Sequence, residues 1–440
     1  MHTLEQLRSG ALAGTRRLDL SCDLKTVPPE VFDLADSLEV LNLSGNQLTS
    51  LPHDLPRLHR LKVIFCSNNP FTELPEVLGD CANLQMVGFK SCRIAQVSAA
   101  ALPQHLRWFI LTDNAVSRVP DALGERPALQ KLMLAGNRLR ALPDSLANAE
   151  RLELLRLSAN HFEALPDWLT QLPRLSWLAL AGNPLGWKHA QPPPLDAVHW
   201  SDLQVDALLG EGASGHIYRA HHRQHSDGLA LKLFKGLVTS DGLPEHELAA
   251  CLAAGQHPAL CTPSGELTGH PEGTRGLLLP LIPQSFTNLA GPPSLESCTR
   301  DVYPSGLRIS APTALRLATQ LADAVAHLHA RGVMHGDLYA HNILWDPRTA
   351  QALLSDFGGA TLLPDAPYAQ RSALLALEVR AFGYLLEELL ALVEPAATGL
   401  DTSVSGMTAL AQACTSLVPA QRPDMAEVAA RLSAELAALA

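Results

Sequence analysis

The sequence has 440 residues, and 47% of them are hydrophobic, which suits two or three globular domains with large cores. The formal net charge of -11 provides no overall basic field for nucleic acid or an acidic membrane. No apolar run reaches the roughly 18 residues of a membrane span, and residues 1–5 do not open a signal-like segment. We therefore expect a cytoplasmic protein with no nucleic-acid partner and no membrane partner. The eight cysteines include no C-x-x-C pair, so reduced thiols are expected.

The first part of the chain repeats the pattern L-x-x-L-x-L-x-x-N-x-L. The copy that begins at Leu38 matches every fixed position of this pattern. Further copies begin, at steps of 22 or 23 residues, at Leu61, Leu84, Leu106, Leu129, Leu152 and Leu175, and a degenerate copy precedes them at Leu18. Residues 13–186 resemble a leucine-rich-repeat solenoid. In that family each repeat forms one short strand, and its leucines are buried only when neighbouring repeats stack against it.

Two sets of positions in the repeats have predicted roles. The asparagines, which should satisfy backbone groups inside the coil, are Asn46, Asn69, Asn114, Asn137, Asn160 and Asn183, with Cys92 in the same place of its copy. The strand positions between the leucines face the concave side, and apolar patches of this extent mark interfaces. The candidates for binding a protein substrate or regulator are Val63, Phe65, Trp108, Ile110, Met133 and Trp177. Alternatively, this face packs on the second domain of the same chain or is a lightly polar sheet.

Three consecutive prolines, Pro192 to Pro194, follow the repeats and favour a stiff, extended spacer. We assign residues 187–204 to a proline-rich linker and residues 205–439 to a second domain.

The second domain opens with a glycine-rich motif. Gly210, Gly212 and Gly215 match G-x-G-x-x-G, and glycines let backbone N–H groups approach phosphates closely. The motif alone equally fits a dinucleotide-binding fold, in which a helix begins at the glycines. Residues 216–220 read instead as a second strand, so a β-hairpin is the better fit.

A lysine follows in an apolar strand over residues 229–234. Lys232 has apolar neighbours on both sides, and a buried ammonium is costly unless it meets phosphate and a carboxylate. The carboxylate candidate is Glu247, in the helical stretch that follows, with Glu245 as the alternative.

Two carboxylates and a carboxamide lie close together further along the chain. Asp337 and Asn342 are five positions apart, and Asp356 follows Asn342 by fourteen. This arrangement suits phosphoryl transfer, in which one Asp faces the attacking hydroxyl while the Asn and the second Asp hold a divalent metal. An amphipathic helix over residues 313–330 is expected to lead into this segment.

Residues 335–342, His-Gly-Asp-Leu-Tyr-Ala-His-Asn, and residues 355–358, Ser-Asp-Phe-Gly, resemble two motifs of the protein-kinase family, H-R-D-L-x-x-x-N and D-F-G. The resemblance covers residues ~205 to 439 and implies a bilobal α+β domain that uses ATP and Mg²⁺.

The resemblance also implies a role for each motif residue. Lys232 would bind the α- and β-phosphates and pair with Glu247, while Asp337 would accept or orient the hydroxyl proton. Asn342 and Asp356 would bind Mg²⁺. The residues implied around the nucleotide are Leu209, Gly210, Gly212, Gly215, Ile217, Ala230 and Leu344.

The sequence departs from the protein-kinase pattern within residues 335–342 and in the segment after Asp356. Gly336 replaces the usual Arg, and Tyr339 replaces the Lys that marks serine/threonine kinases. Only 22 positions separate Asp356 from Glu378, which begins a segment like the family's D-V-x-x-F-G helix. No A-P-E signature is present, although Arg422 resembles the late Arg that pairs with its Glu. We therefore hypothesise that phosphorylation of the segment after Asp356 does not switch the enzyme on.

The sequence thus predicts a multidomain α/β protein, a leucine-rich-repeat solenoid followed by a bilobal protein-kinase-like domain. The expected activity is ATP-dependent phosphorylation of protein hydroxyls, of the serine/threonine kind, with the solenoid recruiting a protein. One alternative is a small-molecule kinase, which His-Gly-Asp and the short segment favour. The other is a scaffold with an inactive kinase domain, which Tyr339, Pro280 and the missing A-P-E favour.

Overall fold

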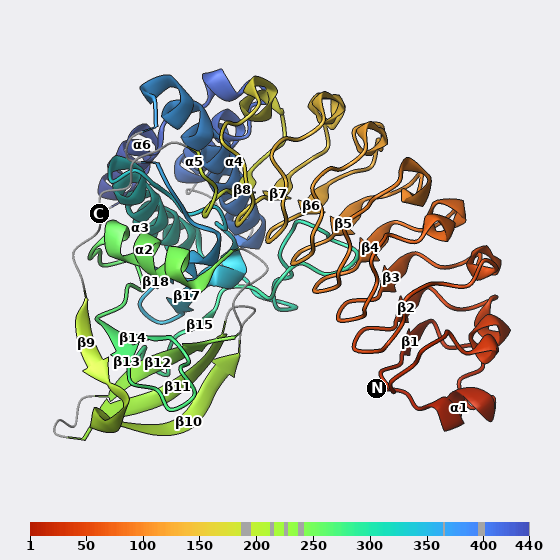
Figure 1. The fold of residues 1–440 in the computed structure, drawn as a ribbon. Helices are drawn as coiled ribbons and strands as arrows, with labels where there is room; N and C mark the ends of the chain where they lie inside the picture. The colour runs from red at the N-terminus through yellow and green to blue at the C-terminus, as the bar shows by residue number, and fades with distance from the viewer. Residues whose placement is uncertain are drawn as a thin grey trace. The chain divides into compact units, whose positions relative to one another are not determined.

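The computed structural model describes residues 1–185, 195–211, 215–223, 228–235, 242–363, 366–394 and 401–439 (Figure 1). The chain divides into two compact units. The first unit comprises residues 1–174 and 183–186, and the second comprises residues 175–182 and 187–440. Residues 175–182, which carry the last copy of the repeat sequence, therefore belong with the second unit.

The first unit is a stack of short parallel strands joined by 3₁₀ turns, with the strands on one face and the turns on the other (Figure 1). The strands pair in sequence order and are β1 (Arg17–Asp19), β2 (Val40–Asn42), β3 (Val63–Phe65), β4 (Met86–Gly88), β5 (Trp108–Ile110), β6 (Lys131–Met133) and β7 (Leu154–Arg156). The turns are η1 (Pro29–Leu34), η2 (Leu55–Arg57), η3 (Glu76–Asp80), η4 (Ala99–Ala101), η5 (Asp121–Leu123), η6 (Asp144–Asn148) and η7 (Asp167–Gln171). A short helix, α1 (Leu4–Arg8), precedes them. The repeat frame predicted from the leucines is confirmed.

The asparagine positions carry the predicted structural role. Asn46 accepts hydrogen bonds from the backbone N–H groups of Cys22 and Leu24, each at 3.0 Å. Its amide nitrogen donates to the carbonyl oxygens of Leu20 and Leu43, each at 2.8 Å. Such bonds satisfy buried backbone groups where the chain leaves each strand. The Cys92 thiol takes the equivalent place and donates to the carbonyl oxygen of Cys66 at 3.5 Å.

The concave-face prediction needs correction at two of its six residues. Val63 is only 5% exposed, on β3 between β2 and β4. Trp177 is only 2% exposed and packs inside the second unit. The other four residues are half-buried and keep some exposed surface; they are Phe65, Trp108, Ile110 and Met133.

The second unit begins with a mixed six-stranded sheet in the order β10-β11-β12-β14-β13-β9. Its strands are β9 (Asp196–His199), β10 (Leu203–Glu211), β11 (Gly215–His222), β12 (Gly228–Phe234), β13 (Gly265–Thr268) and β14 (Gly276–Pro280). One helix, α2 (Pro244–Ala254), lies between β12 and β13 in sequence. β9 and the turn η8 (Trp200–Asp202) fall in the stretch predicted as linker, and β9 pairs in parallel with β13.

The rest of the second unit is mainly helical (Figure 1). Its helices are α3 (Ala311–Ala330), α4 (Tyr368–Leu392), α5 (Asp401–Cys414) and α6 (Met425–Ala438). Its short strands and turns are β8 (Trp177–Ala179), β15 (Thr287–Asn288), β16 (Val333–Met334), η9 (Ala340–Asn342), β17 (Ile343–Asp346), β18 (Gln351–Leu354), η10 (Phe357–Gly359), β19 (Thr361–Leu362) and η11 (Pro419–Gln421).

The predicted amphipathic helix is α3, which starts two residues earlier than expected. Ser310 caps it by accepting a hydrogen bond from the Thr313 N–H at 3.2 Å. Its predicted apolar face is fully buried and consists of Leu317, Leu321, Ala324 and Leu328. Among the residues that the structure describes, no helix has both the length and the apolar character needed to cross a membrane.

Candidate active site

The nucleotide side of the candidate site centres on Lys232. This residue lies on β12, is 7% exposed, and forms an ion pair with Glu247 of α2, which is 4% exposed. Its Nζ also lies 3.9 Å from Oδ1 of Asp356. Glu245, the alternative partner, points elsewhere and lies 3.6 Å from Arg275. Three charged side chains from separate elements therefore meet at one point.

The charges at this point support one another. Burial on its own lowers the pKa of the Lys232 ammonium, but the charges of Asp356 and Glu247 outweigh it and raise that pKa. Lys232 is therefore held as a cation in a nearly buried place. A fixed cation attracts the phosphates of a nucleotide, and the exposed carboxylate of Asp356 beside it could hold a divalent cation against them.

The glycine-rich motif forms the predicted hairpin. In the pairing of β10 with β11, Gly210 lies opposite Ile217, and Ile217 in turn lies opposite Lys232 on β12. A side chain at Gly215 would come within 2.4 Å of the Leu233 carbonyl oxygen, so glycine is required there. Gly212, the middle glycine of the motif, lies outside the described residues.

The remaining residues expected around adenine are spread over the sheet and β17. Ala230 is buried on β12, two positions before Lys232 and so on the same face. Leu209 is 47% exposed on β10, and Leu344 is half-buried on β17. Contact of these side chains with adenine stays a prediction.

Residues 335–342, which correspond to the H-R-D-L-x-x-x-N motif and are called here the catalytic loop, bring Asp337 and Asn342 together. The Asn342 amide nitrogen donates to Asp337 Oδ2 at 2.8 Å and to the Asp337 carbonyl oxygen at 2.9 Å. The Ser355 N–H and hydroxyl both donate to the carbonyl oxygen of Asn342, at 2.9 and 2.8 Å. The hairpin of β17 and β18 thus links the loop to Asp356, which follows Ser355 directly.

A buried carboxylate accepts hydrogen bonds from the backbone of the loop. Glu378 of α4 is 1% exposed and accepts hydrogen bonds from the N–H groups of His335 and Gly336, at 3.1 and 2.6 Å. Its Oε2 also lies 2.8 Å from Nε2 of His329. Burial on its own raises the pKa of the Glu378 carboxyl, but His329 and the loop N–H groups outweigh it and lower that pKa. Fully buried His335 packs against Phe357, with 5.1 Å between ring centroids.

One support of the loop is not predicted from the sequence. It is Asp301, which lies within residues 291–306. Its carboxylate accepts from the His341 N–H at 2.9 Å and lies 2.8 Å from His341 Nδ1. Burial on its own lowers the pKa of the His341 imidazole, but the Asp301 bond and nearby carboxylates outweigh it and raise that pKa. Nothing local in residues 291–306 marks this contact, which joins residues 40 positions apart.

The late arginine, left without a partner by the missing A-P-E, binds backbone instead. Arg422 donates to the carbonyl oxygens of Ala376 and Ser416, at 2.8 and 3.0 Å. Burial lowers the pKa of its guanidinium to about 10.

The residues present fit a magnesium ion. Asn342 uses its amide nitrogen on Asp337, which leaves its carbonyl oxygen as a potential ligand. Asp356 has a side chain that is 38% exposed, and its Oδ1 accepts from the Gly358 N–H at 3.2 Å. Carboxylate and amide oxygens are the ligands that Mg²⁺ prefers.

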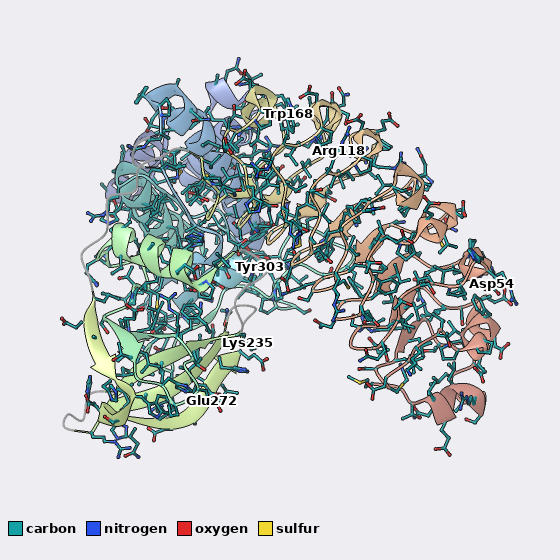
Figure 2. All side chains as sticks on the ribbon, in the orientation of Figure 1. Asp54, Arg118, Trp168, Lys235, Glu272 and Tyr303 are labelled. Carbon is teal, nitrogen blue, oxygen red and sulfur yellow. The ribbon has the colours of Figure 1, made fainter. Side chains whose placement is uncertain are left out.

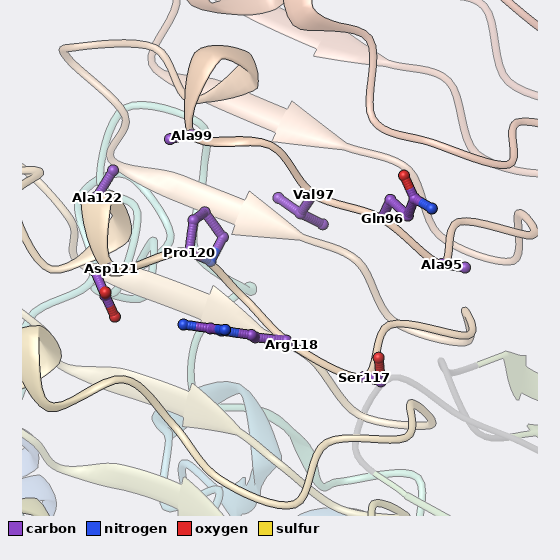
Figure 3. Close-up of a pocket in the computed structure, with 9 residues that line it drawn as sticks. All are labelled: Ala95, Gln96, Val97, Ala99, Ser117, Arg118, Pro120, Asp121 and Ala122. Atoms are coloured by element: carbon purple, nitrogen blue, oxygen red, sulfur yellow. The ribbon is translucent and has the colours of Figure 1, made fainter.

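A separate hollow lies in the first unit. It has a volume of about 520 Å³, and the residues that line it include Gln96, Val97, Arg118, Pro120 and Asp121 (Figure 3). None of the residues predicted to handle phosphate lines it.

Comparison with known proteins agrees with this description of both units. A model described as "Protein kinase domain" matches residues 203–374, which include the Lys232, Asp337 and Asp356 motifs. Models described as "Leucine rich repeat" and "Leucine Rich repeats (2 copies)" match residues 104–162, 127–185 and 36–79. The chain therefore combines leucine-rich repeats with a protein kinase domain.

Several curated proteins are similar to part of this chain. Serine/threonine-protein kinase SBK2 of Rattus norvegicus is 28% identical over 151 residues, 34% of this chain and 38% of the relative. Cyclin-dependent kinase B2-1 of Arabidopsis thaliana is 26% identical over 183 residues, 40% of this chain and 56% of the relative. Probable inactive serine/threonine-protein kinase roco10 of Dictyostelium discoideum is 28% identical over 126 residues, 27% of this chain and 5% of the relative. The chain thus spans only part of the length of each relative.

Proposed function

We propose that the second unit is an ATP- and Mg²⁺-dependent protein kinase of the serine/threonine kind. One observation carries the proposal. The Lys232–Glu247 ion pair lies beside Asp356, and Asp337 is hydrogen-bonded to Asn342 on the same catalytic hairpin. This set provides a cation for phosphate, two oxygen ligands for a metal, and a carboxylate for the acceptor hydroxyl.

Each residue has one step in the proposed reaction. Lys232, oriented by Glu247, holds the α- and β-phosphates. Asn342 and Asp356 would hold Mg²⁺, which when bound supplies positive charge against the phosphates. Asp337 orients the acceptor hydroxyl and takes its proton as the oxygen bonds to the γ-phosphorus. The bond from that phosphorus to the bridging oxygen breaks, and ADP leaves with the electron pair.

A transfer assay with radiolabelled ATP tests the proposal. Purified full-length protein is incubated with Mg²⁺ and generic protein substrates, beside Asp337→Asn and Lys232→Ala. We expect label on protein with the wild type and a loss of about 100-fold or more in both variants. Glu245→Ala is a matched control, since Glu245 lies on the same helix as Glu247 but faces Arg275. Label that persists in both site variants would contradict the proposal.

Two other functions have specific support. A small-molecule kinase is favoured by the short stretch of eleven residues between Asp356 and the start of α4 at Tyr368. A scaffold without transfer activity is favoured by Tyr339 at the position of the usual Lys and by the relative named as probably inactive. Nucleotide binding without label on any protein would support one of these two.

The repeats are proposed to recruit a protein, as such repeats generally do. The proposed surface comprises the half-buried concave residues Phe65, Trp108, Ile110 and Met133. A full-length variant with Trp108→Ser and Met133→Ser should fail to capture a protein that the wild type captures. Equal capture by both would place the binding surface elsewhere.

A further inference from the structure

Two departures from the protein-kinase pattern, Gly336 and Tyr339, contact the same segment of the second unit. That segment comprises residues 175–182 and is called here the 175–182 segment. It carries the last repeat strand, β8, which lies beside α4 within the unit. The two departures flank Asp337, the proposed acceptor-side carboxylate.

Position 336 requires glycine because the backbone of the 175–182 segment lies directly against it. Its φ is +72°, which L side chains rarely adopt. A Cβ there would lie 2.7 Å from the Leu178 carbonyl oxygen and 2.3 Å from the Gly359 carbonyl oxygen. The Arg of the family pattern therefore cannot stand at this position while the segment is docked.

Tyr339 forms the other side of this contact. Its ring stacks on the indole of Trp177, with 4.3 Å between centroids and 7° between planes. The Trp177 Nε1–H donates to the carbonyl oxygen of Leu338 at 2.9 Å. The two aromatic rings are almost fully buried, at 2% exposed for Trp177 and 5% for Tyr339. The residues on both sides of Asp337 are thus in contact with one segment.

The same segment also reaches the strand that follows Phe357–Gly359. The Leu180 N–H donates to the hydroxyl oxygen of Thr361 at 3.0 Å. Thr361 belongs to β19 and pairs with Met334 of β16, the strand that enters the catalytic loop. Trp177 is further enclosed by Tyr384 of α4, at 5.7 Å between centroids, with Arg300 lying 3.3 Å from the Tyr384 ring centroid. Tyr303, close to Arg300 in sequence, is labelled in Figure 2.

We propose that the 175–182 segment, through Trp177, positions Asp337 for phosphate transfer in place of a full-length activation segment. The inference rests on the proposed kinase function. The segment has contacts within the loop and after the Asp-Phe-Gly turn, where Thr361 in turn pairs with the strand before the loop. Only eleven residues lie between Asp356 and α4, so little other chain is available to support this side. Trp177 and Thr361 are positioning residues, because they act through the backbone around Asp337.

Substitutions of Trp177 in the full-length protein test the proposal. Trp177→Phe keeps a ring for stacking but removes the N–H donor, and Trp177→Leu removes both. We expect kcat to fall several-fold in the first and by about 10- to 100-fold in the second, since small misplacements of reacting groups are costly. The KM for ATP should change by less than about twofold, because Lys232 and Glu247 lie on other elements.

Trp168 is the matched control. It lies in η7, in the copy that begins at Leu152 and so precedes the copy of Trp177; it is half-buried and is labelled in Figure 2. Trp168→Phe and Trp168→Leu should leave kcat within about twofold of the wild type. A folded Trp177→Leu protein with wild-type kcat, or an equal loss in both Trp168→Leu and Trp177→Leu, would overturn the proposal.

Two substitutions of Thr361 test the proposal if the Trp177→Leu protein does not fold. Thr361→Val removes the acceptor for the Leu180 N–H with little change in shape, while Thr361→Ser retains it. We expect Thr361→Val to lower kcat several-fold and Thr361→Ser to recover most of that loss. Equal activity of the two variants would contradict the proposal.

Hydrogen exchange separates this inference from the kinase function. Peptides covering residues 333–342 should exchange faster in Trp177→Leu than in the wild type or Trp168→Leu, whatever the substrate. Faster exchange without any transfer activity in the wild type would refute the kinase proposal while supporting the positioning role. Unchanged exchange in a folded Trp177→Leu protein would refute the positioning role.

Discussion

The contacts that stabilise the two units join residues at very different separations in the sequence. In the repeats, Asn137 bonds to backbone groups that lie 3 residues away in its own copy and 21 and 26 residues away in the preceding copy. Around the catalytic loop, Gly336 bonds to Glu378 over 42 residues, Trp177 to Leu338 over 161, and Leu180 to Thr361 over 181. In the repeats the same contacts recur from copy to copy. Around the catalytic loop the contacts join segments that share no local sequence pattern.

This difference has a consequence for substitutions. A change in one repeat should affect that repeat and its neighbours, because each repeat contacts mainly the next. A change beneath the catalytic loop should affect several distant segments together, because they meet at a few buried groups. Four predictions sharpen or break this comparison.

The largest effect is expected from Glu378→Ala. The substitution leaves the buried N–H groups of His335 and Gly336 and the His329 ring without their shared acceptor. We expect a loss of about 3–5 kcal/mol in stability of the second unit and at least a ~100-fold loss of transfer. Hydrogen exchange of the full chain should show the change in peptides of the second unit.

The matched control for this change is Glu387→Ala. Glu387 lies on the same helix but is exposed, so its loss should cost less than about 0.5 kcal/mol. If Glu378→Ala altered exchange only within α4, the loop would not depend on this carboxylate as described.

The second effect is expected from Gly336→Ala. A methyl group here meets two carbonyl oxygens and a backbone with φ of +72°. Left-handed backbone alone costs a non-glycine residue about 1–2 kcal/mol, and the two close contacts should raise the total to about 2–4 kcal/mol. Unfolding by denaturant, together with kcat, measures the change.

Gly306→Ala separates the two contributions. Gly306 has a φ of +79° but no atom within 4 Å of its would-be Cβ, so only the backbone cost applies. Similar losses for both variants would show that the Leu178 and Gly359 carbonyls do not crowd Gly336.

The repeat frame could be predicted from the sequence because a single period fixes it. Leu38 and Asn46 need only the adjacent copies to be buried and bonded, and both behave as expected. The same holds for the pairing expected at Lys232. Of the two carboxylates that the helix after the Lys232 strand offers, Glu247 is the one that forms the ion pair.

The supports of the catalytic loop could not be predicted, since each depends on a contact between segments far apart in sequence. The strand position of Trp177 in its repeat predicts a place on the binding surface, yet its ring packs on Tyr339. Asp301 lies in an insert without any periodic pattern, and its partner His341 is 40 residues away. Glycine is required at position 336 because the Leu178 carbonyl, 158 residues away in sequence, lies next to it.

The third effect is expected from Asn137→Ala in the first unit. The change removes hydrogen bonds to the Val116 N–H and to the Leu111 and Leu134 carbonyls, all of them buried. We expect a loss of about 2 kcal/mol, with faster exchange limited to neighbouring repeats and unchanged transfer activity. Exposed Asn148→Ala is the control and should cost less than about 0.5 kcal/mol. Faster exchange throughout the first unit would show that the repeats respond as one block.

The smallest effect is a pH dependence at Glu388 of α4. Burial raises the pKa of this carboxyl to about 7; neighbouring Asp301 and Glu387 add to the rise, while the Tyr303 hydroxyl and Arg300 oppose it. A carboxyl whose pKa is higher in the folded than in the unfolded state contributes stability at low pH. That contribution is lost as the pH rises through about 7. Glu388→Gln removes the titration. The free energy of unfolding of the variant, relative to that of the wild type, should therefore be higher at pH 8 than at pH 5 by on the order of 1 kcal/mol.

Urea unfolding of the wild type and the variant at both pH values measures this gain. Glu272→Gln is the control, because Glu272 is exposed and its substitution should give the same stability difference at both pH values. A Glu388→Gln difference that does not change with pH would mean that the carboxyl is ionised throughout. The contact between residues 303 and 388 would then be an ordinary hydrogen bond to a charged group. In that case the two units would differ in the reach of their contacts but not in their sensitivity to pH.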